Sequence, residues 1–224
     1  MARVADHELK REEVAEAVQR VIARHGIDAA TIREIAREAG CSAGALAHYF
    51  RSKDDLLLYA FRLTSERAMA RAGRWVGRGP GLATLRAAVL ETLPLDDERR
   101  VEVQTWCSFL GKAISRPAMA AVQREQEAAW RALLCAIIEA GQRDGTIRRD
   151  LEASEEAEAL SAVIDGLTIQ AIVEPDRLPP ERQCAYIDRY LAGLTQASTL
   201  LPSEGVGAAR MPAPFPARSR RRGG

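Results

Sequence analysis

Side chains that suit contact with a negatively charged polymer gather in one short stretch, TIREIAREAGCSAGALAHYF. Thr31 and Ser42 each precede a helical pattern, so each offers a hydroxyl and free backbone N–H groups to a phosphate oxygen. Ala43, Gly44 and Ala45 follow, and side chains this small let a helix backbone approach another molecule closely. A helix that served only for packing would need bulk there. The stretch therefore predicts a nucleic-acid contact.

Two helical patterns position these residues, and Gly40 separates them. Thr31 and Glu34 form a T-x-x-E capping box at the start of the first pattern, and Ser42 caps the second. One apolar face on each pattern allows the two to pack together: Ile32, Ile35, Ala36 and Ala39 on the first, Leu46 and Phe50 on the second. Residues 31–50 therefore predict a helix-turn-helix, whose second helix, of about eight residues, enters the major groove of DNA.

Few side chains are available to read the bases. Ala43, Gly44 and Ala45 carry no side-chain hydrogen-bond donor, although the Ala45 methyl can contact a thymine. Lys53 follows on the exposed side, where it can meet a phosphate. Residues 1–53 hold nine basic and eight acidic side chains, so affinity must depend on a few well-placed contacts. Base recognition is expected from the longer side chains: Arg33, Ser42, His48 and Tyr49.

The arrangement TIREIAREAGCSAGALAHYFRSKDDLL resembles the DNA-binding domain of the TetR family of transcriptional regulators, over about residues 8–67. The resemblance implies an all-α homodimer, with a three-helix N-terminal DNA-binding domain and a larger C-terminal domain for ligand binding and dimerisation. Ala47 stands where many members have tyrosine, so one contact of the family is missing. Carried over to this chain, the family's DNA contacts fall on Thr31, Tyr49 and Lys53 at phosphates and on Arg33 at a base or phosphate.

The C-terminal part is similar to the BetI type of the family, chiefly through Trp106 and the segment DGLTIQAIVEPDRLPPERQCAYIDRYL. About nine helices are expected in all. The GRGPG stretch that begins at Gly77 is the clearest break between them. The expected organisation is a DNA-binding domain at residues 8–68, a ligand-binding and dimerisation domain at residues 82–200, and a disordered basic tail at residues 202–224.

Composition sets few limits on function. The 224 residues are 47% hydrophobic and 28% charged with a net charge of +1, so no global charge signature marks a nucleic-acid binder. The N-terminus has no apolar signal segment, and no uncharged apolar run reaches about 18 residues. We therefore expect a cytoplasmic, nucleoid-associated protein without membrane contact. The four cysteines form no CxxC pair, and neither a metal site nor a cofactor is expected.

Two tryptophans indicate where a ligand could bind. Trp106 and Trp130 fall on consecutive antiparallel helices that turn near Arg116, at depths that differ by about 6 Å. They can line one cavity or belong to the core, and both alternatives remain open. In a cavity they could hold a cation, and nearby glutamines could orient a ligand. The predicted pocket residues are Trp106, Phe109, Leu110, Val122, Gln126, Trp130, Leu133 and Gln170.

Each of the last two predicted helices, at residues 154–173 and 180–198, has two apolar faces. A surface helix needs one apolar stripe to pack on its own core, so the second indicates a partner. Gly166 would let two backbones approach closely across a two-fold axis. The predicted dimer interface consists of Ala162, Gly166, Ile169, Val173, Tyr186 and Tyr190.

Catalysis is not expected from this sequence. All three histidines precede the C-terminal domain, and Glu-x-x-His, P-loop and Gly-x-Gly-x-x-Gly patterns are missing. We interpret the chain as a ligand-responsive transcriptional regulator, a repressor whose dimer binds a palindromic operator in double-stranded DNA. A small-molecule effector of unknown identity would release it. The alternative is a constitutive architectural DNA-binding protein without ligand control; a helical enzyme is the least favoured class.

Overall fold

The computed structural model describes residues 2–195, and the side chains of residues 7–195. The predicted tail at residues 202–224 lies outside this range. Every regular element inside it is an α-helix, which confirms the all-α prediction, and none of these helices is both long and apolar enough to cross a bilayer. The described helices are α1 (Ala2–His25), α2 (Ile32–Glu38), α3 (Ala43–Leu46), α4 (Lys53–Gly73), α5 (Gly81–Leu90), α6 (Asp97–Ala113), α7 (Pro117–Asp144), α8 (Ala153–Val173) and α9 (Pro180–Gly193).

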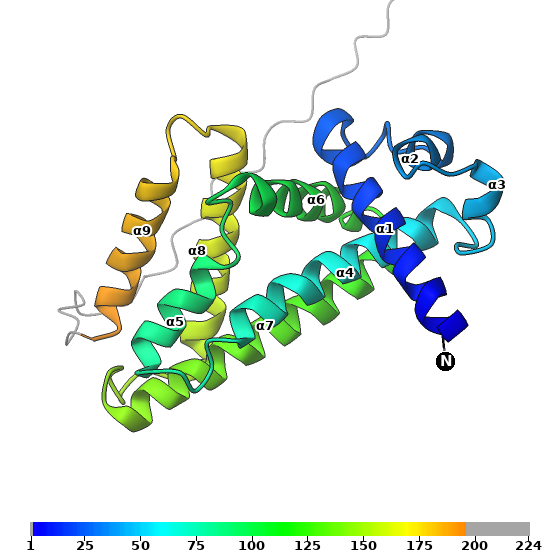
Figure 1. The fold of residues 1–224 in the computed structure, drawn as a ribbon. Coiled ribbons are helices and arrows are strands. Elements are labelled where there is room, and N and C mark those ends of the chain that lie inside the picture. Colours follow the sequence, from blue (N-terminus) through cyan, green and yellow to red (C-terminus); the bar gives the residue numbers. More distant parts are fainter. Residues whose placement is uncertain (1, 196–224) are drawn as a thin grey trace, which may run out of the picture.

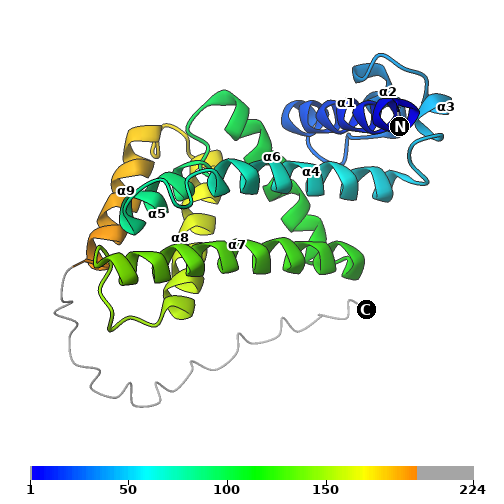
Figure 2. The same cartoon turned by 60° about the horizontal axis from the view of Figure 1, so that its bottom comes forward.

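Two long helices, α4 and α7, run side by side through the molecule, as Figures 1 and 2 show. Helices α1, α2 and α3 gather around one end of α4 (Figure 1). Helices α5, α8 and α9 lie toward the opposite end of the molecule. Helix α6 lies between the two groups and packs against α1, α4, α7 and α8. A change in the position of α6 therefore affects both ends of the molecule.

Local caps fix the helix-turn-helix. The Thr31 hydroxyl accepts a hydrogen bond from the N–H of Glu34 at 3.2 Å, and Ser42 accepts one from the N–H three residues on at 3.1 Å. Between the two helices Gly40 has φ +65°, the left-handed region that glycine adopts without steric cost. Only half of the predicted capping box forms, because the Glu34 carboxylate pairs with Arg37 instead of turning back to Thr31.

The second helix of this motif is shorter than predicted. Helix α3 ends at Leu46, and the chain continues through a turn at residues 47–49. The N–H groups of His48 and Tyr49 donate to carbonyls three residues back, at 3.1 and 3.0 Å. This tighter spacing is common where a helix ends, and the turn is followed by Phe50, whose ring is buried. His48 and Tyr49 are therefore presented by a turn and not by a helix.

Two buried clusters hold the helices together. The N-terminal cluster contains residues of α1 to α4, but also Phe109 and Ala113 of α6 and Met119 and Val122 of α7. Within it the rings of Phe61 and Phe109 stack with their centroids 3.9 Å apart. The C-terminal cluster is built chiefly from α5, α7, α8 and α9. The side chains that support the DNA-binding domain thus come partly from helices outside it.

Helix α5 crosses α7 at two glycines. A Cβ atom on Gly81 would lie 2.2 Å from the Cα of Gly141, well inside van der Waals contact. Helix α5 has no side-chain cap of its own. Instead, the N–H of Gly81 donates to the Asp144 carboxylate at 2.7 Å, and the next N–H donates to the Thr146 hydroxyl at 3.1 Å. The turn after α7 therefore satisfies the first donors of α5.

Candidate functional site

The predicted DNA-contacting residues belong to the helices at the end of the molecule opposite α9 (Figure 1). They come from the first turns and N-caps of α2, α3 and α4 and from the turn after α3. All nine are accessible to a partner: Thr31, Arg33, Ser42, Ala43, Gly44 and His48 are exposed, and Ala45, Tyr49 and Lys53 are partly exposed.

Two cationic side chains on this surface are free to bind an anion. Neither Arg33 nor Lys53 forms an ion pair with any residue in the described range, whereas Arg37 is engaged by Glu34. The Tyr49 ring lies against the ring of His7 in α1, with centroids 4.8 Å apart, and this contact restricts its orientation. An unpaired guanidinium and an unpaired ammonium beside free helix N-termini form a surface suited to phosphate oxygens.

Two ion pairs connect the corner between α6 and α7 to this surface. The Lys112 ammonium contacts the carboxylate of Asp28, in the loop between α1 and α2, and lowers its pKa. Arg116 lies 2.9 Å from the carboxylate of Asp54, which directly follows Lys53 in the first turn of α4. Neither pair is predictable from the sequence, because the partners are far apart along the chain. Both pairs join this corner to segments next to predicted DNA-contacting residues.

A cavity of about 120 Å³ lies between α4, α6, α7 and α8. Trp106 of α6 and Trp130 of α7 both line it, and Gln126 lies beside them. Trp130 is 9% exposed, so its ring belongs both to the cavity wall and to the C-terminal cluster. Three predicted pocket residues thus meet at one cavity.

The other predicted pocket residues do not line this cavity. Leu110 borders a neighbouring hollow. Phe109 and Val122 are buried in the N-terminal cluster, and Leu133 packs against the C-terminal cluster. Gln170 is exposed and accepts a hydrogen bond from the turn after α8 at 2.6 Å. Successive helix positions point about 100° apart, and the apolar pattern of α6 and α7 did not fix which of several apolar positions faces inward.

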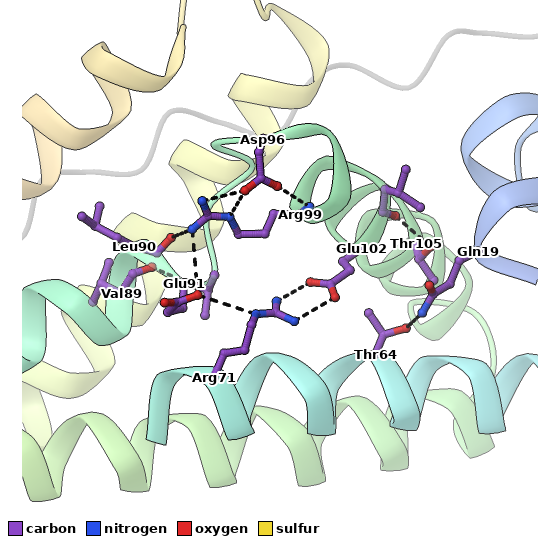
Figure 3. Close-up of polar contacts among 12 residues, drawn as sticks. Gln19, Thr64, Arg71, Val89, Leu90, Glu91, Asp96, Arg99, Glu102 and Thr105 are labelled. Carbon is purple, nitrogen blue, oxygen red and sulfur yellow. Dashed lines mark hydrogen bonds and ion pairs between the residues drawn. The ribbon is translucent and has the colours of Figure 1, made fainter. Parts of the chain in front are cut away.

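A polar network ties α6 to α4 and to the end of α5 (Figure 3). Both terminal nitrogens of Arg71 donate to Glu102, one of them at 3.0 Å, and its Nε lies 3.6 Å from Glu91. Arg99 donates to the carbonyl of Leu90 at 2.9 Å. Glu102 also lines the cavity, but Arg71 neutralises its charge.

Two further carboxylates, those of Glu127 and Asp165, lie in the cavity wall, and a single guanidinium, that of Arg131, lies beside them. Glu127 accepts a hydrogen bond from Gln123 at 2.7 Å, and burial raises its pKa although Arg131, 3.9 Å away, opposes the rise. Asp165 has no hydrogen bond or ion pair with the described residues. Burial, and then the nearby Glu127 carboxylate, raise the pKa of Asp165 to about 7. The cavity therefore combines two indole rings with two carboxyl groups whose ionised forms are destabilised by burial.

A buried hydrogen bond reaches from α1 to the cavity wall (Figure 3). Gln19 of α1 donates to the Thr64 hydroxyl of α4 at 2.6 Å, and that hydroxyl donates to the Ala60 carbonyl at 2.7 Å. Gln19 is 8% exposed and Thr64 is 4% exposed, so water cannot easily replace the bond. Because Thr64 also lines the cavity, this bond joins the cavity wall to α1.

The second apolar face of α8 is open to solvent in the single chain. Val173 is 72% exposed, an unusual value for a large apolar side chain at the end of a well-packed helix. Tyr190 differs from the other predicted interface residues, because it packs against the C-terminal cluster and its hydroxyl donates to Glu156 at 3.2 Å. The other predicted interface residues are exposed or partly exposed: Ala162, Gly166, Ile169, Val173 and Tyr186.

Two family models match the chain. Residues 14–60 match the model described as bacterial regulatory proteins of the tetR family. Residues 81–196, more than half of the chain, match the model described as the C-terminal part of BetI-type transcriptional repressors. The chain belongs to the TetR family of transcriptional regulators.

Similar transcriptional regulators match this chain over most of their length. The HTH-type transcriptional regulator PksA of Bacillus subtilis is 32% identical over 184 residues, which cover 81% of this chain and 88% of PksA. A transcriptional regulator from Rhodococcus has a crystal structure with a TM-score of 0.76 and 31% identity, covering 86% of this chain and 99% of that one. A regulator from Saccharomonospora viridis, solved in complex with choline, has a TM-score of 0.75 and 27% identity. The match covers 82% of this chain and 95% of the Saccharomonospora chain. These relatives are transcriptional regulators and not enzymes.

Proposed function

We propose that this TetR protein is a repressor that binds an inverted-repeat operator in double-stranded DNA as a homodimer and releases it when a small molecule enters the cavity. The connection between cavity and DNA-contacting surface carries the proposal. Thr64 in the cavity wall holds Gln19 of α1, and α6, which forms another wall, leads into the corner that is bonded to Asp28 and Asp54. A ligand that displaces α4 or α6 would change how the two DNA-binding domains are spaced. Action on an operator would place the protein in the cytoplasm, at the nucleoid.

The proposed DNA contacts are the nine accessible residues of the N-terminal helices. Arg33 and Lys53 carry unpaired charges within the described range, so each can bind DNA without first breaking an ion pair. His48 and Tyr49 sit in the turn after α3, beside the small residues 43–45. A short helix with a small-residue surface lets this turn approach the base edges closely.

Substitution of Lys53 by alanine should weaken binding to all DNA sequences to a similar degree and reduce the salt slope by about one unit. Arg33→Ala should cost about 1–3 kcal/mol and relax the preference for the operator over a scrambled duplex. Arg37→Ala is the matched control, because its guanidinium is already engaged by Glu34. Gel-shift titrations at several salt concentrations measure all three variants. Parent-like binding by folded Arg33→Ala and Lys53→Ala proteins would remove both residues from the DNA contact.

The proposed effector is an organic cation. The cavity offers the faces of Trp106 and Trp130 together with the carboxylates of Glu127 and Asp165. Arg131 neutralises one of these carboxylates at most, and a bound cation would neutralise the other. The choline found in the similar Saccharomonospora protein supports the same chemistry.

Choline and the primary amine pentylamine are suitable probes of this site. Binding should change the tryptophan fluorescence, release the operator and stabilise the fold, by about 2.7 kcal/mol at a hundred times the dissociation constant. Trp106→Ala should weaken cation binding about tenfold or more, while ligand-free operator binding stays within a few fold. Affinity should also fall as the pH drops below about 7, because Asp165 then takes up a proton while Glu127 and Arg131 stay beside it. Release with unchanged potency from both Trp106→Ala and Trp130→Ala would show that the tryptophans serve only as core.

The proposed dimer forms through the exposed face of α8 together with Tyr186 of α9. Ala162, Gly166, Ile169 and Val173 recur along this face at spacings of three or four residues, so they form one continuous stripe. Helices α8 and α9 lie side by side at the end of the molecule away from the DNA-contacting surface (Figure 1). Pairing there leaves both DNA-binding domains free to reach successive half-sites.

A further inference from the structure

A second hollow adjoins the cavity. It has a volume of about 360 Å³ and lies between α6, α7 and α8. Glu127 and Asp165 line both spaces, so the cavity and the hollow lie on either side of one pair of carboxylates. Two tryptophans line the cavity, whereas most residues that line the hollow are polar or charged. The remaining residues of the hollow are Leu110, Gln123, Arg131, Glu158, Ser161 and Ala162, of which Ala162 also borders the proposed dimer interface.

One face of α8 presents a row of polar groups to these two spaces. Glu158, Ser161, Asp165 and Thr168 are separated by three, four and three residues, so they share a helix face. Glu158 and Asp165 are two turns apart, about 10 Å along the helix axis. Glu158 has no ion-pair partner within the described residues, and it is exposed at the hollow. Negative charge is therefore available at two points along the row.

Each space also contains a buried oxygen without a hydrogen-bond partner. In the hollow this oxygen is Oε1 of Gln123, a residue that is 7% exposed and whose amide nitrogen is already bonded to Glu127. In the cavity it is the hydroxyl of Thr168, which is 5% exposed. Buried acceptors without partners are rare and costly in folded proteins. Both oxygens can accept a hydrogen bond from a bound molecule.

The charge balance matches a ligand with two cationic groups. Apart from Glu102, which Arg71 neutralises, three carboxylates line the two spaces, those of Glu127, Asp165 and Glu158, against the single guanidinium of Arg131. Two negative charges thus remain above about pH 7, where Asp165 is ionised as well. A quaternary ammonium has no N–H group and cannot use the Gln123 oxygen, whereas a primary ammonium donates three hydrogen bonds.

We propose that the effector is an elongated dication with a primary amine at its outer end. One cationic group lies in the cavity against the tryptophans and Asp165, and the terminal ammonium lies in the hollow, where it donates to Glu158 and to Oε1 of Gln123. The inference rests on the proposed cation-responsive function and adds the second subsite. Glu158 and Gln123 would then determine the specificity of the site for the length of the effector and for its second positive charge.

Cadaverine and pentylamine test the second subsite, because they have the same carbon chain and differ by one amine. Titrations of the full chain, followed by tryptophan fluorescence and calorimetry, should show that cadaverine binds about tenfold more tightly or better, the effect of one added charge-assisted interaction. In Glu158→Gln the affinity for cadaverine should fall to that for pentylamine, which itself stays unchanged. Glu155→Gln, an exposed substitution on the same helix outside the hollow, should preserve the preference for cadaverine.

The possible failures of this experiment are distinguishable. If pentylamine binds and cadaverine binds no more tightly, the second subsite is wrong and the cationic effector of the proposed function stands. If cadaverine retains its advantage in Glu158→Gln, the terminal ammonium lies elsewhere and the proposed site is overturned. If neither amine nor choline binds, the cationic effector and the dication fall together.

Discussion

The Gly81→Ala protein should melt about 10 °C below the parent. The new methyl group would lie 2.2 Å from the Cα and 2.3 Å from the backbone nitrogen of Gly141, and neither atom can rotate away. Helix α5 would have to move off α7, which would weaken the hydrogen bonds from its first N–H groups to Asp144 and Thr146. Overpacking usually costs about 1–3 kcal/mol, and a clash with backbone should reach or exceed the upper value. For a chain of this size that corresponds to the stated shift in melting temperature.

Gly79→Ala is the matched control for this prediction. Gly79 is two residues earlier in the same connection, and a Cβ atom built there meets no atom within 4 Å. Its melting temperature should stay close to that of the parent. Thermal unfolding followed by far-ultraviolet circular dichroism compares the two variants. Equal melting temperatures for Gly81→Ala and Gly79→Ala would show that α5 can shift without loss and that the close crossing is dispensable.

Gly166→Arg should produce a folded monomer that binds the operator at least about a hundredfold more weakly. Within one chain, a Cβ atom on Gly166 meets nothing within 4 Å, and the position is partly exposed, so we expect a longer side chain to turn toward solvent. Any large effect must therefore come from a partner. The variant would place a charged side chain in the middle of the stripe formed by Ala162, Ile169 and Val173. A monomer has one DNA-binding domain, so it loses the gain in operator affinity that comes from simultaneous contact with two half-sites.

Sedimentation velocity and gel-shift titration of the same sample separate the two effects of this substitution. Circular dichroism should match that of the parent, because the side chain is accommodated within the chain. Ala136→Arg, on an exposed position of α7, introduces the same charge away from the proposed interface and should remain dimeric. A Gly166→Arg protein that still sediments as a dimer would exclude this face of α8 as the interface.

Features fixed by neighbours in sequence were predictable, and features fixed by distant contacts were not. The caps at Thr31 and Ser42 depend on an N–H group three residues away, so the sequence predicts them directly. The contact between Gly81 and Gly141 joins two helices sixty positions apart along the chain, and no local pattern indicates it. Gly81 ends the GRGPG stretch, which the sequence indicates only as a break between helices. In the structure Gly81 is the residue on which the α5 crossing depends.

The residues of the cavity also divide into those that the sequence predicts and those that it does not. Trp106 and Trp130 could be placed together because both fall in apolar stripes on consecutive helices. The apolar pattern does not distinguish between neighbouring apolar positions, and Phe109 belongs to the N-terminal cluster instead of the cavity wall. Asp165 was missed, although a signal existed. An aspartate spaced four residues from Ser161 and three from Thr168, in a helix that is otherwise largely apolar, indicates a polar row that faces something other than solvent.

The stacking of Phe61 on Phe109 has a consequence for how DNA specificity can be exchanged between TetR relatives. A chimera joined after residue 68 would set Phe61 against a foreign α6, and the helix ends that carry Ala113 and Met119 would no longer match the grafted domain. The DNA-binding domain is therefore not an interchangeable module. A chimera that keeps both operator recognition and stability must also include the corner between α6 and α7. Substitutions of Phe61 among TetR relatives should be accompanied by compensating substitutions in α6.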